Sequence, residues 1–119
     1  MKDPFTQDYL HSRNGGVITS ASNPDTTLTL NWTRASDNYT AEADLKYFVY
    51  RSDSDNISTV QNAVDNGTLL NVGGSADINT YNVSGLNPGT TYYFNVIVED
   101  EAGYKAAYSS LEIESPLEP

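Results

Sequence analysis

The side chains of this sequence that suit a chemical role, by their type and spacing, are two groups of carboxylates. One group precedes an apolar run and the other ends one; together they comprise Asp37, Glu42, Asp44, Glu99, Asp100 and Glu101. Hard cations such as Ca2+ bind about six to eight oxygen ligands, which carboxylates supply. The loop pattern of an EF-hand is absent. The sequence therefore predicts a Ca2+ site only if the fold brings the two groups together.

The remaining side chains exclude the common catalytic arrangements. His11 is the single histidine, it lies in a segment without a clear period, and the chain has no cysteine. A Ser–His–Asp triad needs a positioned histidine, and zinc sites need several His or Cys ligands. Glycosidases need two carboxylates opposed across a cleft, which the small β-sandwich predicted below rarely provides. We therefore expect no enzyme activity, and no cofactor apart from the candidate Ca2+.

Four tyrosines form a second candidate surface, for contact with a glycan or a protein. They are predicted to be exposed, and they are Tyr39, Tyr50, Tyr93 and Tyr104. Exposed aromatic rings suit stacking on a ligand, and the other interpretation is that these rings form cross-strand pairs that stabilise the faces of a sheet. Both interpretations remain open at the level of the sequence.

Charge and composition narrow the class of partner. The net charge is −10, with only 6 Lys and Arg against 16 Asp and Glu. No basic stripe can form, so nucleic acid is excluded as a partner, and an anionic membrane surface would repel the chain. No apolar run approaches the length of a membrane span, and the first residues lack the apolar core of a signal peptide. We expect the natural protein to be longer than these 119 residues.

Strict alternation of apolar and polar residues predicts β-strands along most of the chain. Leu28, Leu30 and Trp32 share one face of a strand, while Tyr47 and Val49 share one face of the next. Period-two patterns of this kind indicate half-buried strands. With turn signals about every 8–12 residues, the whole pattern predicts seven short strands in an all-β antiparallel sandwich.

One segment breaks the β pattern and predicts a short helix at residues 58–65. Ile57, Val60 and Val64 recur at helical spacing, Ser58 and Gln61 form a capping-box pattern, and Asn66-Gly67 follows as a stop. So short a helix is unstable alone, so its apolar stripe should pack on an edge or end of the sheet. The face of Phe48 and Tyr50 is also unusually apolar and should be covered by another part of the chain.

The domain is predicted at residues 15–114, with a lead at 1–14 and an exit linker at 115–119. A short helix is expected at residues 6–11 within the lead. Short, charged strand edges suggest a monomer.

The run from Leu86 through Pro88 to Tyr92, together with the upstream Trp32 and the strand at Tyr47, resembles the fibronectin type III family over residues 16–113. The resemblance is greatest to bacterial members that lie beside other domains in extracellular proteins. It implies an immunoglobulin-like sandwich, in which the helix is an insertion between strands C and C′. The structural residues it implies are Trp32, Tyr47, Leu86, Pro88, Tyr92 and Phe94. The Tyr92 hydroxyl is expected to bond back to the preceding turn, as a tyrosine corner.

The resemblance also places the loops after strands B and F at the same end of the sandwich. Asp37, Glu42 and Asp44 then lie near Asp100 and Glu101, where they would form a Ca2+ site. The other interpretation is that Asp37 and Asp100 cap their own turns through side-chain hydrogen bonds.

The resemblance and the absence of catalytic chemistry together indicate a non-catalytic extracellular or cell-surface module. Its role would be a spacer, or contact with a protein or a glycan, next to neighbouring domains of a longer chain. The alternative is an accessory domain that helps a polysaccharide-degrading enzyme to hold carbohydrate. The Arg-Gly-Asp adhesion tripeptide of some members is absent.

Overall fold

The computed structural model describes residues 10–11, 16–22, 27–37 and 40–115. Most of the predicted lead, residues 116–119 and Tyr39 therefore lie outside the described residues. The strands are β1 Leu10–His11, β2 Ile18–Ser22, β3 Leu28–Trp32, β4 Ser36–Asp37, β5 Lys46–Ser52, β6 Thr68–Leu69, β7 Ser75–Ala76, β8 Thr80–Val83, β9 Thr91–Glu99, β10 Lys105–Ala107 and β11 Leu111–Glu114. The α-helix α1 spans Val60–Asn66, and a 3-10 turn spans Glu42–Asp44.

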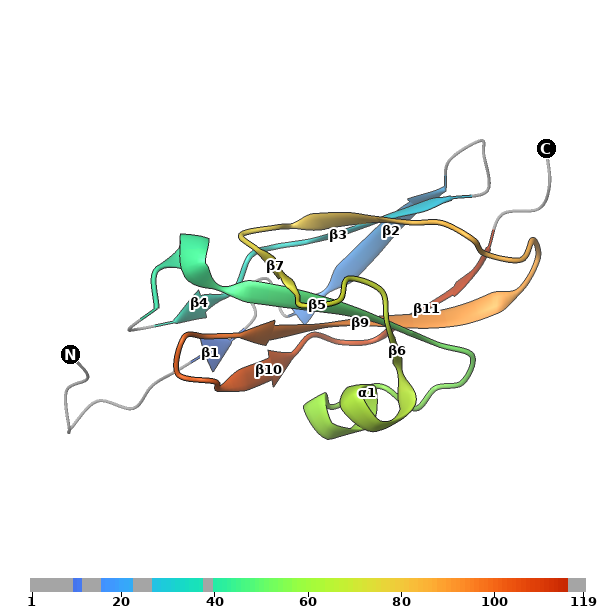
Figure 1. Cartoon of the computed structure of the whole chain (residues 1–119). Coiled ribbons are helices and arrows are strands. Elements are labelled where there is room, and N and C mark those ends of the chain that lie inside the picture. Colours follow the sequence, from blue (N-terminus) through green and yellow to red (C-terminus); the bar gives the residue numbers. More distant parts are fainter. Residues whose placement is uncertain (1–9, 12–15, 23–26, 38–39, 116–119) are drawn as a thin grey trace.

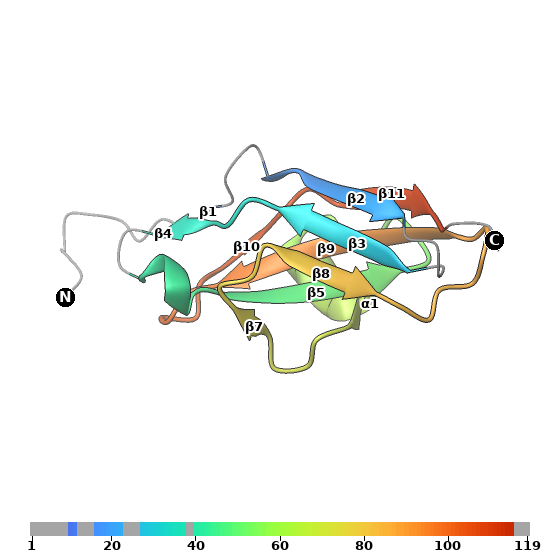
Figure 2. The same ribbon diagram turned by 90° about the horizontal axis from the view of Figure 1, so that it is seen from above.

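Two antiparallel sheets pack face to face, as the alternation predicts. One sheet has the order β2-β3-β8, and the other has the order β10-β9-β5-β6, with β11 also on β9 and β7 also on β5. β6 with β7 and β10 with β11 are pairs of short, separate strands, so the described residues contain more strands than the seven expected. Figure 1 shows the layers from the side, and Figure 2 shows β2, β3 and β8 lying over the second sheet. The predicted fold class is confirmed.

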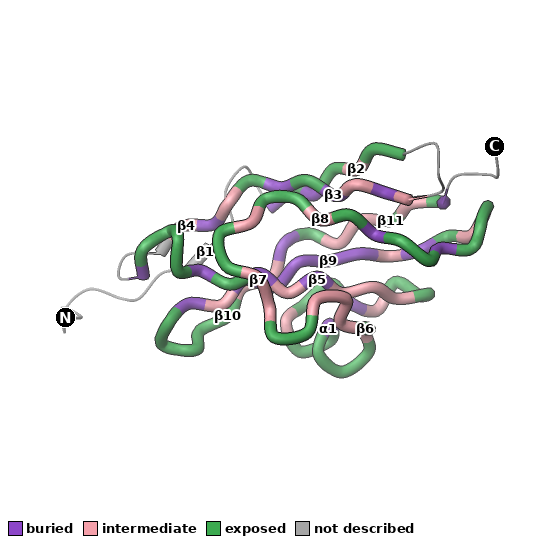
Figure 3. The backbone as a smooth tube through the Cα atoms, turned by 45° about the horizontal axis from the view of Figure 1, so that its top comes forward, coloured by how far each residue is buried: buried purple, intermediate pink, exposed green. Residues whose placement is uncertain are grey.

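The core lies between the two sheets and is lined by the residues that the alternation assigned to it. Leu28 and Leu30 of β3 are fully buried, and so are Tyr47 and Val49 of β5. The ring of Trp32 lies 6.0 Å from that of Tyr47, centroid to centroid, so it bridges the two sheets. Figure 3 shows β9 buried along most of its length. Burying rings of this size contributes much of the stability of a thin sandwich.

The predicted tyrosine corner is present at the turn before β9. Tyr92 is buried, and its hydroxyl accepts a hydrogen bond of 2.9 Å from the backbone N–H of Asn87. Gly89 has a φ of 65°, which is the left-handed region that the turn requires and glycine tolerates. The corner therefore fixes the entry of the chain into β9.

The helix is present between β5 and β6, but three details of its prediction are wrong. It begins two residues later than expected, because Thr59 is the N-cap and its side chain accepts a 3.1 Å hydrogen bond from the Asn62 N–H. It also lies on the outer face of the second sheet, not at an edge or end (Figure 1). Its stripe is shifted, since Ala63 is buried while Val64 is 47% exposed.

The helix covers the apolar outer face of β5, as expected. Ile57, Ala63 and Ile97 form a second small core, against which Phe48 and Tyr50 pack. The buried Asn95 amide of β9 donates a 2.8 Å hydrogen bond to the carbonyl of Ile57, which ties the segment before the helix to the sheet. Because seven residues do not form a stable helix in water, this packing is what maintains it.

The side chain of Asn71 forms hydrogen bonds with the part of the β5 edge that β6 and β7 leave unpaired. Between β6 and β7, the Asn71 amide donates to the Tyr47 carbonyl and accepts from the Val49 N–H, both at 2.8 Å. The side chain thus makes the pair of bonds that a strand residue would make. The short strand β7 begins soon after, at Ser75.

The two ends of the described domain also differ from expectation. Leu10–His11 is a strand paired with β4, not the end of a short helix. Ser115, the first residue of the predicted exit linker, is buried and donates its N–H to the Thr90 carbonyl at 2.8 Å.

Replacing Tyr92 with phenylalanine tests the corner. The change removes the acceptor of the Asn87 N–H while keeping the buried ring. We expect the free energy of unfolding to fall by about 1 kcal/mol, the usual net value of such a bond. Tyr93→Phe is the matched control, because Tyr93 lies on the outer face, and chemical denaturation measures both. Equal losses in the two variants would contradict the assignment.

Candidate functional site

The two acidic loops meet at one end of the sandwich, which confirms that part of the prediction. The first loop follows β3 (residues 33–45) and the second follows β9 (residues 100–104). The backbone N–H of Glu101 donates a 3.2 Å hydrogen bond to the Thr40 hydroxyl across the gap between them. An open hollow of about 470 Å³ lies here, lined by Asp44, Lys46, Glu99, Asp100, Glu101, Ala102 and Gly103.

The carboxylates at this end are brought near one another without forming a coordination shell. Glu42, Asp44 and Glu101 are exposed. The backbone of Asp37 pairs in β4, and the Asp37 side chain lies outside the description. Among the described residues, no three acidic or histidine side chains are grouped so that they would hold a metal ion. The Lys46 ammonium in the hollow also competes with a bound cation.

Asp100 is the best-defined carboxylate of this end, and it caps its own turn. It is 5% exposed, and its Oδ1 accepts hydrogen bonds of 2.9 Å from the N–H groups of both Ala102 and Tyr104. Gly103 closes the turn with a φ of 91°. The Oδ2 atom of Asp100 is buried and has no hydrogen-bond partner in the described structure. This geometry is the turn-capping interpretation of Asp100, and the Ca2+ prediction stays a prediction.

The predicted tyrosine surface is divided between two places. Tyr50 and Tyr93 both pack against the small core beneath α1, on the outer face of the second sheet. Loss of solvent raises the pKa of the Tyr50 hydroxyl, and the nearby Glu99 carboxylate adds to that rise. Tyr104 is 54% exposed in the loop after β9, and Tyr39 lies outside the described residues. The three described rings therefore do not form one platform.

A second hollow lies beside α1 and was not predicted. It measures about 200 Å³ and is lined by Phe48, Tyr50, Val64, Ile97, Glu99 and Lys105. The signal for it in the sequence was the apolar face of Phe48 and Tyr50. That pattern predicts that another segment covers this face of β5, but it does not give the fraction of the face that stays uncovered.

Comparison with known proteins assigns the family. The family model described as Fibronectin type III domain matches residues 15–114. The chain belongs to the fibronectin type III family. No curated protein sequence matches it significantly. The match covers the whole sandwich, from three residues before β2 to the end of β11.

Solved structures agree with this fold. The sixth fibronectin type III domain of human fibronectin type III domain containing protein 3 has a TM-score of 0.62 at 17% identity, covering 86% of this chain and 83% of that one. An Fn3-like protein from Clostridium thermocellum has a TM-score of 0.59 at 16% identity, covering 82% and 86%. Fibronectin type III domains are generally non-catalytic modules of larger proteins. The twitchin kinase region of C. elegans is one larger chain that matches over part of its length: the match covers 77% of this chain and 14% of that one, at 16% identity and a TM-score of 0.50.

Among the described residues, no helix has the length and apolar character needed to cross a membrane.

Replacing Asp100 with alanine tests its capping role. The variant loses the acceptor of two backbone N–H groups in the turn. We expect the free energy of unfolding to fall by about 1–3 kcal/mol. Glu101→Ala is the matched control, since Glu101 is exposed, and it should change stability by less than about 0.5 kcal/mol. An unchanged Asp100→Ala variant would show that the cap is dispensable.

Calcium titration of the same proteins separates the two interpretations of the acidic end. If Asp100 only caps its turn, added Ca2+ leaves the melting temperature of the wild-type chain unchanged. A true site at about one hundred times its Kd would add about 2.7 kcal/mol, and Asp100→Ala would remove that gain. Magnesium at equal ionic strength is the control for general screening of the acidic surface.

Proposed function

We propose that this chain is a spacer and protein-contact module of a bacterial extracellular or cell-surface protein. The observation that carries the proposal is that the chain enters and leaves the sandwich at opposite ends. A domain built in this way transmits the direction of the chain from one neighbour to the next, whereas a domain with adjacent termini would be a side branch.

The two ends are fixed by different contacts. At the entry, β1 pairs with β4, in the loop region that also contains Thr40 and Glu101. At the exit, the Ser115 hydroxyl bonds the Asn87 carbonyl and accepts a 3.0 Å hydrogen bond from the Thr90 N–H, in the turn before β9. β9 joins these ends, and its 9 residues span about 30 Å.

The extracellular location is supported by the resemblance of the Leu86–Tyr92 run to bacterial extracellular members and by the high acidic charge, which favours solubility. We favour protein contact over the accessory role in holding polysaccharide. Stacking on a sugar needs exposed rings in one place, and Tyr50 and Tyr93 are instead half-buried beside α1, away from Tyr104.

A replacement experiment in the full-length protein tests the spacer role. The domain is exchanged for an unrelated fibronectin type III sandwich of equal length, and in a second version it is deleted. The spacer role predicts that the exchange preserves the reach and surface exposure of the flanking domains, while the deletion shortens the reach. Small-angle scattering and protease accessibility on intact cells measure the two properties. A protein confined to the cytosol would refute the proposed location.

A further inference from the structure

The hollow beside α1 has rigid apolar walls. Phe48 and Tyr50 of β5 and Ile97 of β9 form its floor, and Val64 of α1 forms one side. The end of the helix is held close to the sheet, since a Cβ on Gly67 would lie 3.0 Å from the Tyr50 ring. The Asn95 side-chain amide also donates a hydrogen bond to the Ile57 carbonyl. Together, this bond and the close approach at Gly67 hold α1 in place as the wall that faces the floor.

The helix is too short to close this space. α1 has seven residues and covers only part of the outer face, so Val64 is left 47% exposed at its border. An exposed apolar wall next to a half-buried aromatic floor is a feature of binding surfaces, whereas a single exposed side chain is not. The inserted helix thus creates a concave apolar site on a face that would otherwise be flat.

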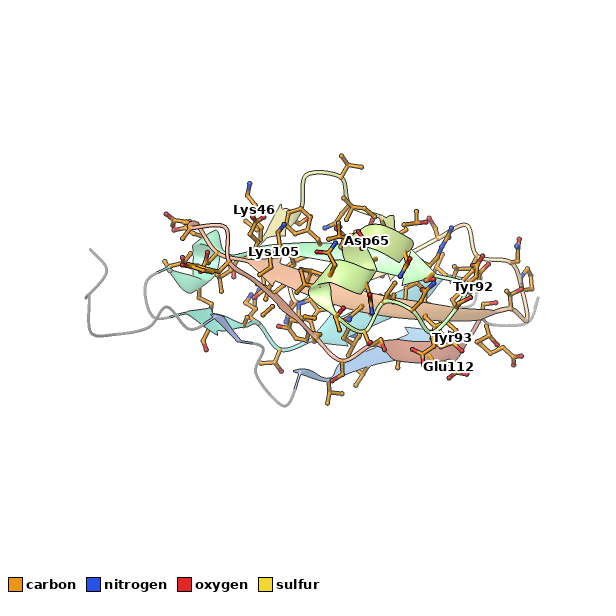
Figure 4. All side chains as sticks on the ribbon, turned by 90° about the horizontal axis from the view of Figure 1, so that it is seen from below. Lys46, Asp65, Tyr92, Tyr93, Lys105 and Glu112 are labelled. Carbon is orange, nitrogen blue, oxygen red and sulfur yellow. The ribbon has the colours of Figure 1, made fainter. Side chains whose placement is uncertain are left out.

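The rim of the hollow carries the Lys105 ammonium beside the Glu99 carboxylate. Lys46 and Lys105 both pair in register with Glu99, on its two sides across the sheet. Figure 4 shows the two lysines near each other at one end of α1. Of the two, Lys105 lines this hollow, whereas Lys46 lines the acidic hollow at the loop end.

The other described cations are already engaged. Arg34 forms a 2.7 Å ion pair with Asp77, and the Arg51 guanidinium lies 5.5 Å from the centroid of the Tyr92 ring. Within the described ranges, neither Lys46 nor Lys105 has an ion pair of this kind. Among the described residues, Lys105 is therefore the cation in the lining of the hollow that remains available to a ligand.

We propose that this hollow docks a segment of a partner protein that inserts one large apolar side chain between α1 and the sheet and places a carboxylate against Lys105. The volume of about 200 Å³ suits one such side chain and is below the usual range for an entire small ligand, about 300–1,000 Å³. The inference rests on the contact role proposed above and assigns it a surface.

A sugar fits the same hollow poorly. Four of its six lining residues present apolar surface. The polar groups of the lining residues are the Glu99 carboxylate, the Lys105 ammonium and the Tyr50 hydroxyl. A sugar ring carries hydroxyls around its edge, and burying these without partners is unfavourable. An apolar side chain has no such groups, so the lining selects protein over glycan.

Three blocked five-residue peptides test the proposal on the whole chain. Each contains one phenylalanine among glycines and, two positions later, glutamate, glutamine or lysine. Salt is kept at about 0.15 M, where charges beyond about 8 Å are screened and the local rim decides the order of affinity. We expect the glutamate peptide to bind with a Kd in the range of about 1–10 mM and to shift the amide NMR signals of Val64, Ile97 and Lys105. The glutamine peptide should bind about threefold more weakly, and the lysine peptide more weakly still.

Two pairs of variants locate the site. Val64→Asp should abolish the shifts, whereas Val72→Asp, at a residue that is 90% exposed and outside the hollow, should not change them. Lys105→Gln should remove the preference for glutamate over glutamine but leave binding of the glutamine peptide unchanged. This second variant keeps the test valid if the charge on α1 unfolds the helix, and Lys46→Gln should have the smaller effect because Lys46 does not line the hollow.

Several results would overturn the proposal. They are an absence of shifts with all three peptides, tightest binding of the lysine peptide, and equal loss of binding in the two valine variants. Shifts of the same signals by cellohexaose without shifts by the peptides would assign the hollow to glycan. None of these outcomes affects the spacer role, which the exchange of the domain in the full-length protein tests separately.

Discussion

The antiparallel pairing of β9 with β5 is the interaction on which the rest of the structure depends. Seven consecutive residue pairs join these strands, from Lys46 with Glu99 to Ser52 with Tyr93. The inner side chains of the pair build the main core, and the outer ones support the helix. Because β9 also pairs with β10 and β11, one strand fixes both loop ends, the tyrosine corner and the floor of the hollow. Loss of this pairing would therefore disrupt the two loop ends, the tyrosine corner and the hollow together.

The core was predictable because it depends on local pattern. Alternation in β3 and β5 assigns Leu30 and Tyr47 to the interior without knowledge of the fold, and the spacing from Leu86 to Tyr92 determines the corner. The position of α1 was not predictable in the same way. Periodicity indicates which residues of a helix are apolar, but the tertiary bond from Asn95 and the close approach at Gly67 decide where the helix rests.

The acidic end shows a second limit of sequence reasoning. The resemblance correctly placed the two loops together, as the bond from Glu101 to Thr40 shows. It could not give the direction of the Asp100 carboxylate, which faces the N–H groups of its own turn. Side-chain direction in a loop follows from backbone dihedrals, such as the positive φ at Gly103, and spacing alone does not determine these. The apolar hollow was missed for a related reason, because its opening depends on the length of one inserted helix.

The Asn71 side chain at the edge of β5 affects how this edge of the sheet could pair with a strand of another domain. The outermost strands there are two residues each, and the stretch between them is closed by an amide side chain bonded to Tyr47 and Val49. An incoming strand from another copy needs a row of free N–H and C=O groups, and this edge of the sheet offers only short fragments of one. If similar domains were tethered next to this one, the edge would resist edge-to-edge aggregation without a proline or a lysine at that position.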